Sequence, residues 1–427
     1  MDSLGIYISV PFCRSKCTYC NFASGVYPAA LHPRYVARLC AEIRGAAERT
    51  AKWGVELPRR VESVYLGGGT PTLLSPELWR ELWRALRQEF DIAKTAEITL
   101  ECAPGQLDDS MLDAVVQCGV NRISFGVQSF IDREAAVSGR LHTREVALRD
   151  LARARFAGIE RVSIDLIAGL PGQTMDSWRQ SLETLLGTGV GHASIYMLEV
   201  DEESRLGREL LAGGGRYHAA AVPNEELTVD LYETAIASLA GCGLGQYEIS
   251  NFARPGQQSR HNLRYWKRQP YLGFGLDAHS FLRTPAGAAL RFQNTAVLDE
   301  YVGAPAAPIV TRALSRSEEL EEAWFLGLRL REGVRWSALQ AEFQVRFDDE
   351  FDEFGRRPTR PAGNDGVMAF HPIVEELCGL ELLSNDGDAV RLTARGMLLS
   401  NEVFARFLDI HEAQPMAPAL FGGAIAV

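Results

Sequence analysis

Apolar and polar positions alternate with two different periods along the first 200 residues. Short runs of β-branched and other apolar residues, typical of buried strands, are separated by longer stretches with the apolar spacing of amphipathic helices. The expected strands are 6–10, 61–66, 97–101, 122–126, 161–167 and 192–199, and the expected helices are 33–50, 76–89, 108–118, 144–156 and 174–186. Ser75 and Asp108 are placed to cap two of these helices. Six β–α repeats predict an α/β fold with a parallel sheet covered by helices.

The regular alternation weakens beyond residue 200. Residues 202–223 are rich in glycine and predict a loop, 224–240 predict a helix, and 284–308, rich in proline and alanine, predict a linker or a surface excursion. A smaller helical module follows and ends with a short strand and a helix, which indicates a winged-helix-like shape. Its polar insertion covers 355–366. The expected units are a core domain over 1–240, a segment over 241–310, a C-terminal domain over 311–410 and a mobile tail over 411–427.

Charge and hydropathy exclude several classes of protein. The formal net charge is -11 and the basic residues are scattered, so a nucleic-acid surface is not expected. No apolar run approaches the roughly 20 residues of a membrane span, and the first residues lack the basic start of a secretory signal. We therefore expect a cytoplasmic protein. Its clustered thiols then favour metal binding over disulfides. Five dispersed cysteines are expected to be buried: Cys40, Cys102, Cys118, Cys242 and Cys378.

Unusual residues follow most of the predicted strands at their carboxyl ends. The segments are 11–20, 67–71, 101–105, 128–129 and 165–172. Parallel α/β sheets and barrels build their binding sites at this edge, so these segments are expected to meet there.

Three cysteines stand within eight residues in the first of these segments. Cys13, Cys17 and Cys20 form a C-x3-C-x2-C motif. Three thiolates this close can hold three corners of an iron–sulfur cube and leave its fourth iron open to a small molecule. The alternative is a structural zinc site, which would need a fourth ligand such as His32 or Cys40. Nothing in the spacing favours either of these as that ligand.

The cysteine motif, with the aromatic Tyr19 before its last cysteine, resembles the signature of the radical S-adenosylmethionine (SAM) superfamily. The resemblance implies a partial (β/α)6 barrel and a 4Fe-4S cluster whose unique iron binds SAM. It also implies that the glycine run after the second strand contacts the methionine part of that cofactor.

Longer runs resemble the oxygen-independent coproporphyrinogen III oxidase group within that superfamily. They are Ile6-Tyr-Ile-Ser-Val-Pro-Phe-Cys13, Gly67-Gly-Gly-Thr-Pro-Thr72, Ser124-Phe-Gly-Val-Gln-Ser129 and Ile164-Asp-Leu-Ile-Ala-Gly-Leu-Pro-Gly-Gln173, with Leu392-Thr-Ala-Arg-Gly-Met-Leu-Leu-Ser-Asn401 near the C-terminus. The resemblance implies that the SAM site is lined by Tyr7, Tyr19, Gly67, Gly68, Gly69, Thr70, Glu101, Gln128, Arg140 and Asp165.

Two subgroups share these motifs. The decarboxylating oxidases carry a fourth cysteine two residues after the third, where this chain has Phe22, and a long segment before the first, where this chain has twelve residues. Both differences favour the other subgroup, the heme chaperones called HemW. His261-Asn-Leu-Arg-Tyr-Trp266 resembles a motif associated with heme in that subgroup. His261 offers an imidazole to iron, and Tyr265 and Trp266 offer flat apolar faces.

The alternative is that His261 bonds a loop and that the aromatic residues belong to the core. His279 is a second candidate heme ligand.

The leading hypothesis from the sequence is a heme chaperone that carries a 4Fe-4S cluster, SAM and heme. The rival is a radical enzyme that oxidises coproporphyrinogen III. The expected partners are heme and heme-accepting proteins, whose identity the sequence leaves open. It also leaves open a homodimer and a peripheral association with membranes.

Overall fold

A twelve-stranded open sheet forms the centre of the molecule. The computed structural model describes residues 3–303, 309–347, 367 and 370–408. Six strands in the middle of the sheet are parallel and follow one another in chain order. They are β1 (Leu4–Val10), β2 (Arg60–Gly68), β3 (Asp91–Cys102), β4 (Arg122–Gln128), β5 (Arg161–Ala168) and β6 (His192–Met197). The predicted parallel α/β sheet is confirmed.

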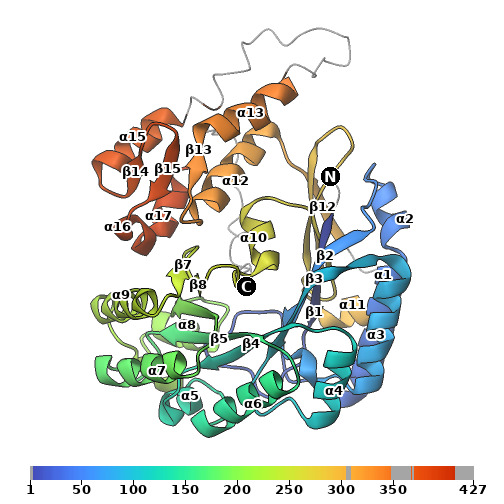
Figure 1. The fold of residues 1–427 in the computed structure, drawn as a ribbon, viewed down its shortest axis with the longest axis vertical. Coiled ribbons are helices and arrows are strands. Elements are labelled where there is room, and N and C mark those ends of the chain that lie inside the picture. The colour runs from blue at the N-terminus through green and yellow to red at the C-terminus, as the bar shows by residue number, and fades with distance from the viewer. Residues whose placement is uncertain (1–2, 304–308, 348–366, 368–369, 409–427) are drawn as a thin grey trace.

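Amphipathic helices connect these strands and cover the outer side of the sheet (Figure 1). They are α1 (His32–Arg44), α2 (Ala46–Ala51), α3 (Pro76–Glu89), α4 (Asp109–Gln117), α5 (Asp132–Val137), α6 (Arg144–Phe156) and α7 (Met175–Gly187). The helix predicted over 33–50 is divided at Gly45. Ser75 and Asp108 cap α3 and α4 as expected, since their side chains accept from the backbone N–H groups of Leu78 and Met111.

Antiparallel strands extend the sheet at both edges. On one edge β9 (Tyr271–Phe274) lies parallel to β1, and the antiparallel strands β10 (His279–Arg283), β11 (Ala289–Asn294) and β12 (Ile309–Ala313) follow. On the other edge, β8 (Asn251–Ala253) and β7 (Gly245–Gln246) follow β6. The two ends of this order do not pair, so the sheet is open, as a partial barrel requires.

The linker predicted over 284–308 is wrong for most of its described length. Its middle is β11, and α11 (Leu298–Gly303) follows. Leu290, Phe292 and Tyr301 are buried in the main core, although the surrounding alanines, prolines and glycines gave no strand or helix signal. The predicted loop over 202–223 likewise contains α8 (Arg205–Leu211) and the short helix η3 (Arg216–Ala221). The helices α9 (Glu225–Gly241) and α10 (Arg260–Trp266) complete this part.

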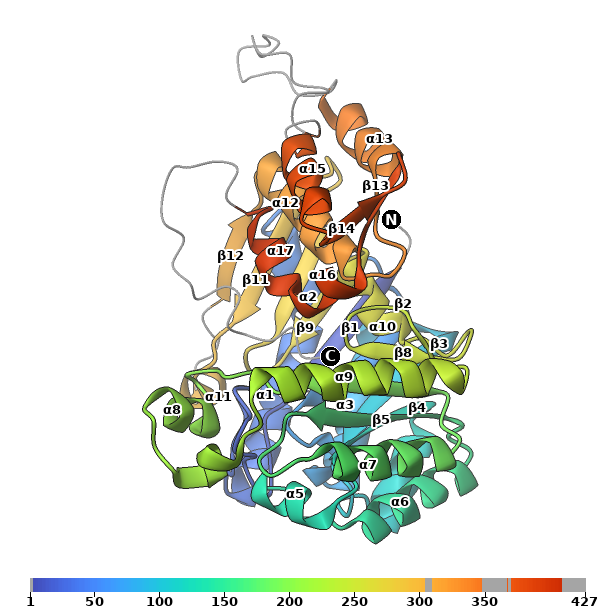
Figure 2. The same cartoon turned by 90° about the vertical axis from the view of Figure 1, so that its left-hand side faces the viewer.

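The C-terminal module has its own apolar core and lies at the opposite end of the molecule from α5, α6 and α7 (Figure 2). Trp324 stacks on Phe407 with ring centroids 5.0 Å apart, and Trp336 meets Trp324 edge-on. Its elements are α12 (Arg316–Leu328), β13 (Val334–Arg335), α13 (Trp336–Phe347), α15 (His371–Gly379), β14 (Leu383–Asn385), β15 (Ala389–Leu392), α16 (Ala394–Leu398) and α17 (Ser400–Ala405). Helices are followed by a small antiparallel sheet, as the sequence predicted. The insertion at 355–366 and the tail at 411–427 lie outside the described residues.

Buried ion pairs join this module to the sheet. Arg268, just after α10, pairs with Glu319 of α12 at 3.1 Å and with Glu342 of α13 at 3.0 Å. Arg283 of β10 pairs with the same two carboxylates at 2.5 and 3.4 Å. Both arginines and Glu319 are nearly fully buried, so removing one charge would leave an opposite charge buried without its partner.

Two other expectations can be checked on the described residues. No helix among them is both long and apolar enough to cross a bilayer. Of the five dispersed cysteines, Cys40, Cys102 and Cys118 are buried as predicted. Cys378 is only half-buried, and the prediction is wrong for Cys242, which is exposed just after the last turn of α9.

Candidate functional site

The three-cysteine loop leaves the carboxyl end of β1 and folds back on itself. The backbone N–H of Cys13 donates to the carbonyl of Gly25 at 2.9 Å. The Lys16 ammonium lies inside the loop and donates to the carbonyls of Phe22 and Ser24, both at 3.0 Å. The loop is therefore held by hydrogen bonds from its own residues to its own backbone carbonyls.

Segments distant in sequence hold the same loop from outside. Thr18 receives a hydrogen bond from the N–H of Leu206 at 2.8 Å and donates its own N–H to Ser138 at 3.1 Å. Arg205 donates to the carbonyl of Lys16. The start of α8 and the end of α5 thus fix the position of the cysteines relative to the sheet.

The three thiols lie close enough to influence one another. Burial raises the pKa of Cys13 and of Cys20, and the neighbouring cysteines raise both further. Within the described ranges, no group of three His, Cys, Asp or Glu side chains is placed to hold a single metal ion. Three sulfur donors from one ordered loop are the donor set of an iron–sulfur cluster with one open iron.

The glycine run at the end of β2 packs directly against the base of this loop. Gly69 donates its N–H to the carbonyl of Val10 at 2.9 Å, and Thr70 donates to Phe12 at 2.7 Å. A Cβ on Gly69 would lie 2.7 Å from both carbonyl oxygens. Gly68 has a φ of +94°, which favours glycine. The run therefore positions the cysteine loop, in addition to the backbone approach that the sequence predicts.

Gly69→Ala is expected to destabilise the protein by about 1–3 kcal/mol and to lower the iron content after reconstitution, because its Cβ would meet backbone atoms that cannot turn away. Gly187→Ala is the matched control, since nothing lies within 4 Å of its Cβ position. Thermal unfolding and iron analysis check both variants. Equal behaviour of the two would contradict the packing argument.

Two half-buried carboxyls lie on β3 and β5, with β4 between them. Glu101 accepts from the Tyr65 hydroxyl at 2.9 Å and from the N–H of Gly68 at 3.2 Å. Asp165 accepts from Ser124 at 2.9 Å. Burial raises the pKa of Glu101 to about 7 and that of Asp165 to about 6. A cationic ligand bound beside these carboxyls would favour their charged forms and lower both pKa values.

These raised pKa values predict a pH dependence for the protein without bound cofactor. The folded state keeps protons on Glu101 and Asp165 that an unfolded chain releases near pH 4, so the free energy of unfolding falls as the pH rises toward 7. Glu101→Gln should reduce that fall between about pH 5 and 8. Denaturant unfolding at several pH values measures it, with the exposed Glu183→Gln as control. If the free energy of unfolding of Glu101→Gln fell with pH as steeply as that of the wild type, the prediction would be refuted.

Gln128, at the end of β4, and Arg140, in the loop between α5 and α6, converge over Gly126. A Cβ on Gly126 would lie 3.0 Å from the amide nitrogen of Gln128 and 3.1 Å from a guanidinium nitrogen of Arg140. Arg140 donates to the sulfur of Cys17 at 3.4 Å. Gln128 has a φ of 70°, uncommon for a residue other than glycine, and its buried Oε1 has no partner among the described residues. An unpaired buried acceptor here fits a ligand that donates hydrogen bonds.

The two tyrosines predicted for this site lie on either side of it. Tyr7 on β1 stacks with Tyr65, with ring centroids 6.1 Å apart. Tyr19 lies in the cysteine loop beside Cys17 and Arg140. The structure therefore gathers the residues predicted for SAM at the carboxyl edge of β1 to β5. The unpaired Gln128 acceptor, the glycine run and the two carboxyls fit a small ligand that carries an ammonium group and hydroxyls.

His261 is not among the residues that meet at the carboxyl edge of β1 to β5. Its ring is fully buried in α10, where Nδ1 lies 2.9 Å from the Ser63 hydroxyl and Nε2 lies 2.8 Å from the Tyr265 hydroxyl. Its backbone N–H donates to Glu97 at 3.1 Å. Burial lowers the pKa of His261 to about 3. Tyr265 and Trp266 are buried too. In this conformation the motif offers heme neither a free ring nitrogen nor an open aromatic face.

The motif contacts the strands before their carboxyl ends. Ser63 and Glu97 pair with each other in the middle of their strands, whereas Gly68 and Glu101 stand at or next to the carboxyl ends. The His261 ring stacks on Tyr65, with ring centroids 5.3 Å apart. His192 repeats the arrangement, between the hydroxyls of Ser163 and Tyr247. Both histidines are thus buried, with a hydrogen-bond partner at each ring nitrogen. His279, the other candidate, is exposed at the start of β10.

Sequence reasoning missed several side chains of the site. Tyr65 holds Glu101, Ser124 and Ser163 hold Asp165, and Lys16 holds the cysteine loop. One signal was present, because Tyr65, Ser124 and Ser163 are polar residues at alternate positions of otherwise apolar strands. Lys16 gave no signal of this kind.

Family comparisons agree with this geometry. Residues 7–185 match the radical SAM superfamily, and residues 314–399 match the HemN C-terminal domain. Coproporphyrinogen III oxidase (HemN) from Escherichia coli superposes with a TM-score of 0.75 over 95% of this chain and 90% of its own, at 22% identity, which establishes a shared fold. An open α/β sheet with three cysteines after β1 and a glycine run after β2 defines a radical SAM protein, and this fold implies a 4Fe-4S cluster and SAM.

Sequence similarity narrows the family further. Heme chaperone HemW from Bacillus subtilis is 33% identical over 94% of this chain and 98% of its own length. HemW from Lactococcus lactis is 31% identical over 94% and 96%. A mitochondrial relative from Bos taurus, radical S-adenosyl methionine domain-containing protein 1, is 37% identical over 77% and 74%. The chain belongs to the HemW family.

Proposed function

We propose that this protein is a heme chaperone, which binds heme and passes it to acceptor proteins. The observation that carries the proposal is the similarity to proteins named heme chaperone HemW, at 31–33% identity along nearly their whole length. Heme and heme-accepting proteins are the partners, and the cytoplasm is the expected location.

Phe22 supports this function over that of a coproporphyrinogen oxidase. The oxidase subgroup is expected to carry a fourth cysteine at this position. Here the Phe22 carbonyl receives the Lys16 ammonium, so the position contributes a backbone contact to the loop and no sulfur.

The residues of the site divide into three roles toward the cofactors. The sulfurs of Cys13, Cys17 and Cys20 would hold a 4Fe-4S cluster, which supplies an open iron for SAM when bound. Glu101 and Asp165 would accept hydrogen bonds from SAM. Its amino acid part would lie along the backbone of the glycine run, with the unpaired Gln128 acceptor beside it.

Heme titration and transfer test the proposal. The protein is reconstituted anaerobically with iron and sulfide, loaded with hemin and mixed with apomyoglobin, and the Soret band of holomyoglobin is followed. We expect stoichiometric hemin binding and transfer faster than from free hemin. Failure to bind hemin would overturn the proposal.

The rival activity is tested in the same preparation. Coproporphyrinogen III, SAM and a reductant are added, and protoporphyrinogen IX is sought after oxidation to the fluorescent porphyrin. We expect none. Its formation at a catalytic rate would favour the oxidase. Size-exclusion chromatography and flotation with liposomes decide the homodimer and the peripheral membrane association.

A further inference from the structure

Tyr65 of β2 lies between the residues of the cofactor site and those of α10. Its side chain is buried, and its hydroxyl donates to Oε1 of Glu101 at 2.9 Å. Its ring stacks with two others, that of Tyr7 at a centroid distance of 6.1 Å and that of His261 at 5.3 Å. Glu101 and Tyr7 belong to the residues predicted for SAM, whereas His261 belongs to the motif associated with heme. Tyr65 therefore touches both groups of residues.

The His261 ring is closed to a metal ion in this conformation. Its Nδ1 lies 2.9 Å from the Ser63 hydroxyl, and its Nε2 lies 2.8 Å from the Tyr265 hydroxyl. Ser63 stands two positions before Tyr65 on the same face of β2, so two residues of one strand hold the ring. The planes of the Tyr65 and His261 rings are 29° apart, as in a stacked pair. Iron could bind only if a ring nitrogen lost its hydroxyl partner, and the stacked Tyr65 opposes that movement.

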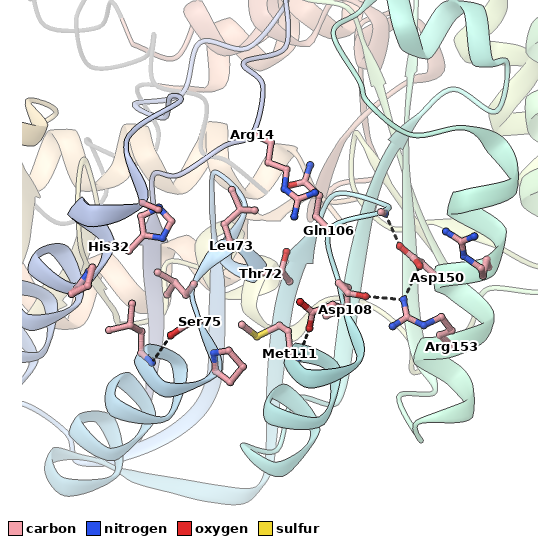
Figure 3. A pocket seen from close by; sticks show the side chains of 18 residues that line it. Arg14, His32, Thr72, Leu73, Ser75, Gln106, Asp108, Met111, Asp150 and Arg153 are labelled. Atoms are coloured by element: carbon pink, nitrogen blue, oxygen red, sulfur yellow. Dashed lines mark hydrogen bonds and ion pairs between the residues drawn. The ribbon is translucent and has the colours of Figure 1, made fainter.

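The cavity shown in Figure 3 does not connect the two groups. It has a volume of about 650 Å³ and lies between the cysteine loop and the first turns of α1, α3 and α4. Tyr65, Glu101 and His261 are not among the residues that line it. A ligand in this cavity would contact neither Glu101 nor His261, so the connection has to come from the contacts of Tyr65.

A ligand at Glu101 changes the hydrogen bond that Tyr65 makes. Burial raises the pKa of Glu101 to about 7, so its carboxyl is partly protonated at neutral pH when no ligand is bound. Beside an ammonium group the carboxylate form is favoured, and a hydrogen bond from a hydroxyl to a carboxylate is shorter and stronger than one to a neutral carboxyl. The Tyr65 hydroxyl would then move toward β3, and its ring would shift relative to that of His261.

We propose that Tyr65 is a positioning residue through which a ligand at Glu101 frees the His261 ring to bind heme iron. The inference rests on the proposed function and on the heme role predicted for His261. Release of the ring would give a motif whose two nitrogens are both occupied a way to bind iron. Linked binding is reciprocal, so hemin should tighten the binding of SAM by the same factor as SAM tightens that of hemin.

Hemin titration with and without SAM tests this link in the anaerobically reconstituted protein. SAM should tighten hemin binding to the wild type by about 5-fold or more. In Tyr65→Phe, which keeps the ring and loses the hydroxyl, this effect of SAM should disappear. Iron content and thermal unfolding confirm that the variant is folded.

Tyr232→Phe is the matched control for Tyr65→Phe. It also removes a buried tyrosine hydroxyl, but one that donates to the backbone carbonyl of Ile249. SAM should tighten hemin binding to this variant as much as it does in the wild type.

Deuterium exchange at the C2 carbon of the His261 ring tests its release without heme, and mass spectrometry of the peptide measures it. The ring is fully buried, so exchange should be slow in the SAM-free protein. It should become several-fold faster with SAM in the wild type and stay slow in Tyr65→Phe. His371, half-buried in α15 of the C-terminal module, is the control and should exchange at the same rate with and without SAM.

The outcomes separate this inference from the proposed function. If hemin binds but its affinity does not depend on SAM, or depends on it equally in Tyr65→Phe, the link is wrong and the chaperone function stands. If the wild type binds no hemin, the function fails and the exchange at His261 alone decides the link. Faster exchange with SAM that Tyr65→Phe lacks would support the link, and equal rates would overturn it.

Discussion

Replacing Cys17 by serine is expected to abolish the broad iron–sulfur absorbance of the anaerobically reconstituted protein, and Cys13→Ser and Cys20→Ser should do the same. Two thiolates hold a cube with an open iron poorly. Iron analysis, sulfide analysis and the visible spectrum measure the loss, which should be nearly complete.

The matched controls for the cysteine variants are Cys242→Ser, at an exposed thiol, and Cys40→Ser, at a thiol buried in α1. Both should retain full iron. A single variant among the three loop cysteines that kept the wild-type iron content and spectrum would exclude this assignment.

The second large effect is expected on stability. Glu319→Ala should lower the free energy of unfolding by about 3–5 kcal/mol, because it removes the buried carboxylate that pairs with both Arg268 and Arg283 and leaves them the half-exposed Glu342 from this network. Denaturant unfolding measures the loss. Since this carboxylate joins α12 to the end of α10 and to β10, the C-terminal module should also become more sensitive to limited proteolysis.

Glu332→Ala provides a control that joins the same two parts of the chain. Glu332 pairs with Lys267 at 2.9 Å, but both side chains are largely exposed. Its loss should cost less than about 1 kcal/mol. Similar losses for the two variants would show that burial of the network does not contribute to the attachment of the module.

The parallel part of the fold was predictable because each strand and helix carries its own periodic pattern. All six central strands are present, although β3 begins six residues before the predicted strand. Each predicted helix between them is present, with the helix over 33–50 split in two, and the short helix α5 was not predicted. The short edge strands were not predictable. β11 has six residues and β9 has four, and such elements owe their stability to the neighbouring strand and not to local preference.

The gathering of the candidate cofactor residues at one edge of the sheet was predictable from residue type, because these residues follow the strands of a parallel sheet. Cys13, Gly69, Glu101 and Asp165 are each conspicuous in sequence, and parallel topology brings them together. The heme role of His261 stays a prediction. A histidine, a tyrosine and a tryptophan in one short helix suit a buried hydrogen-bonded cluster as well as a heme face, and in this conformation both ring nitrogens of His261 have partners.

The pairing of β1 with β9 has a consequence for biosynthesis. During synthesis, β1 acquires one neighbour when β2 has been made, about 60 residues later, but the other only when residues 271–274 have been made. Thr18, in the cysteine loop, likewise waits for Leu206. A nascent chain shorter than this exposes an unpaired strand edge next to three reactive thiols. Metal insertion is therefore expected late in translation or after release, when strand and loop are both enclosed.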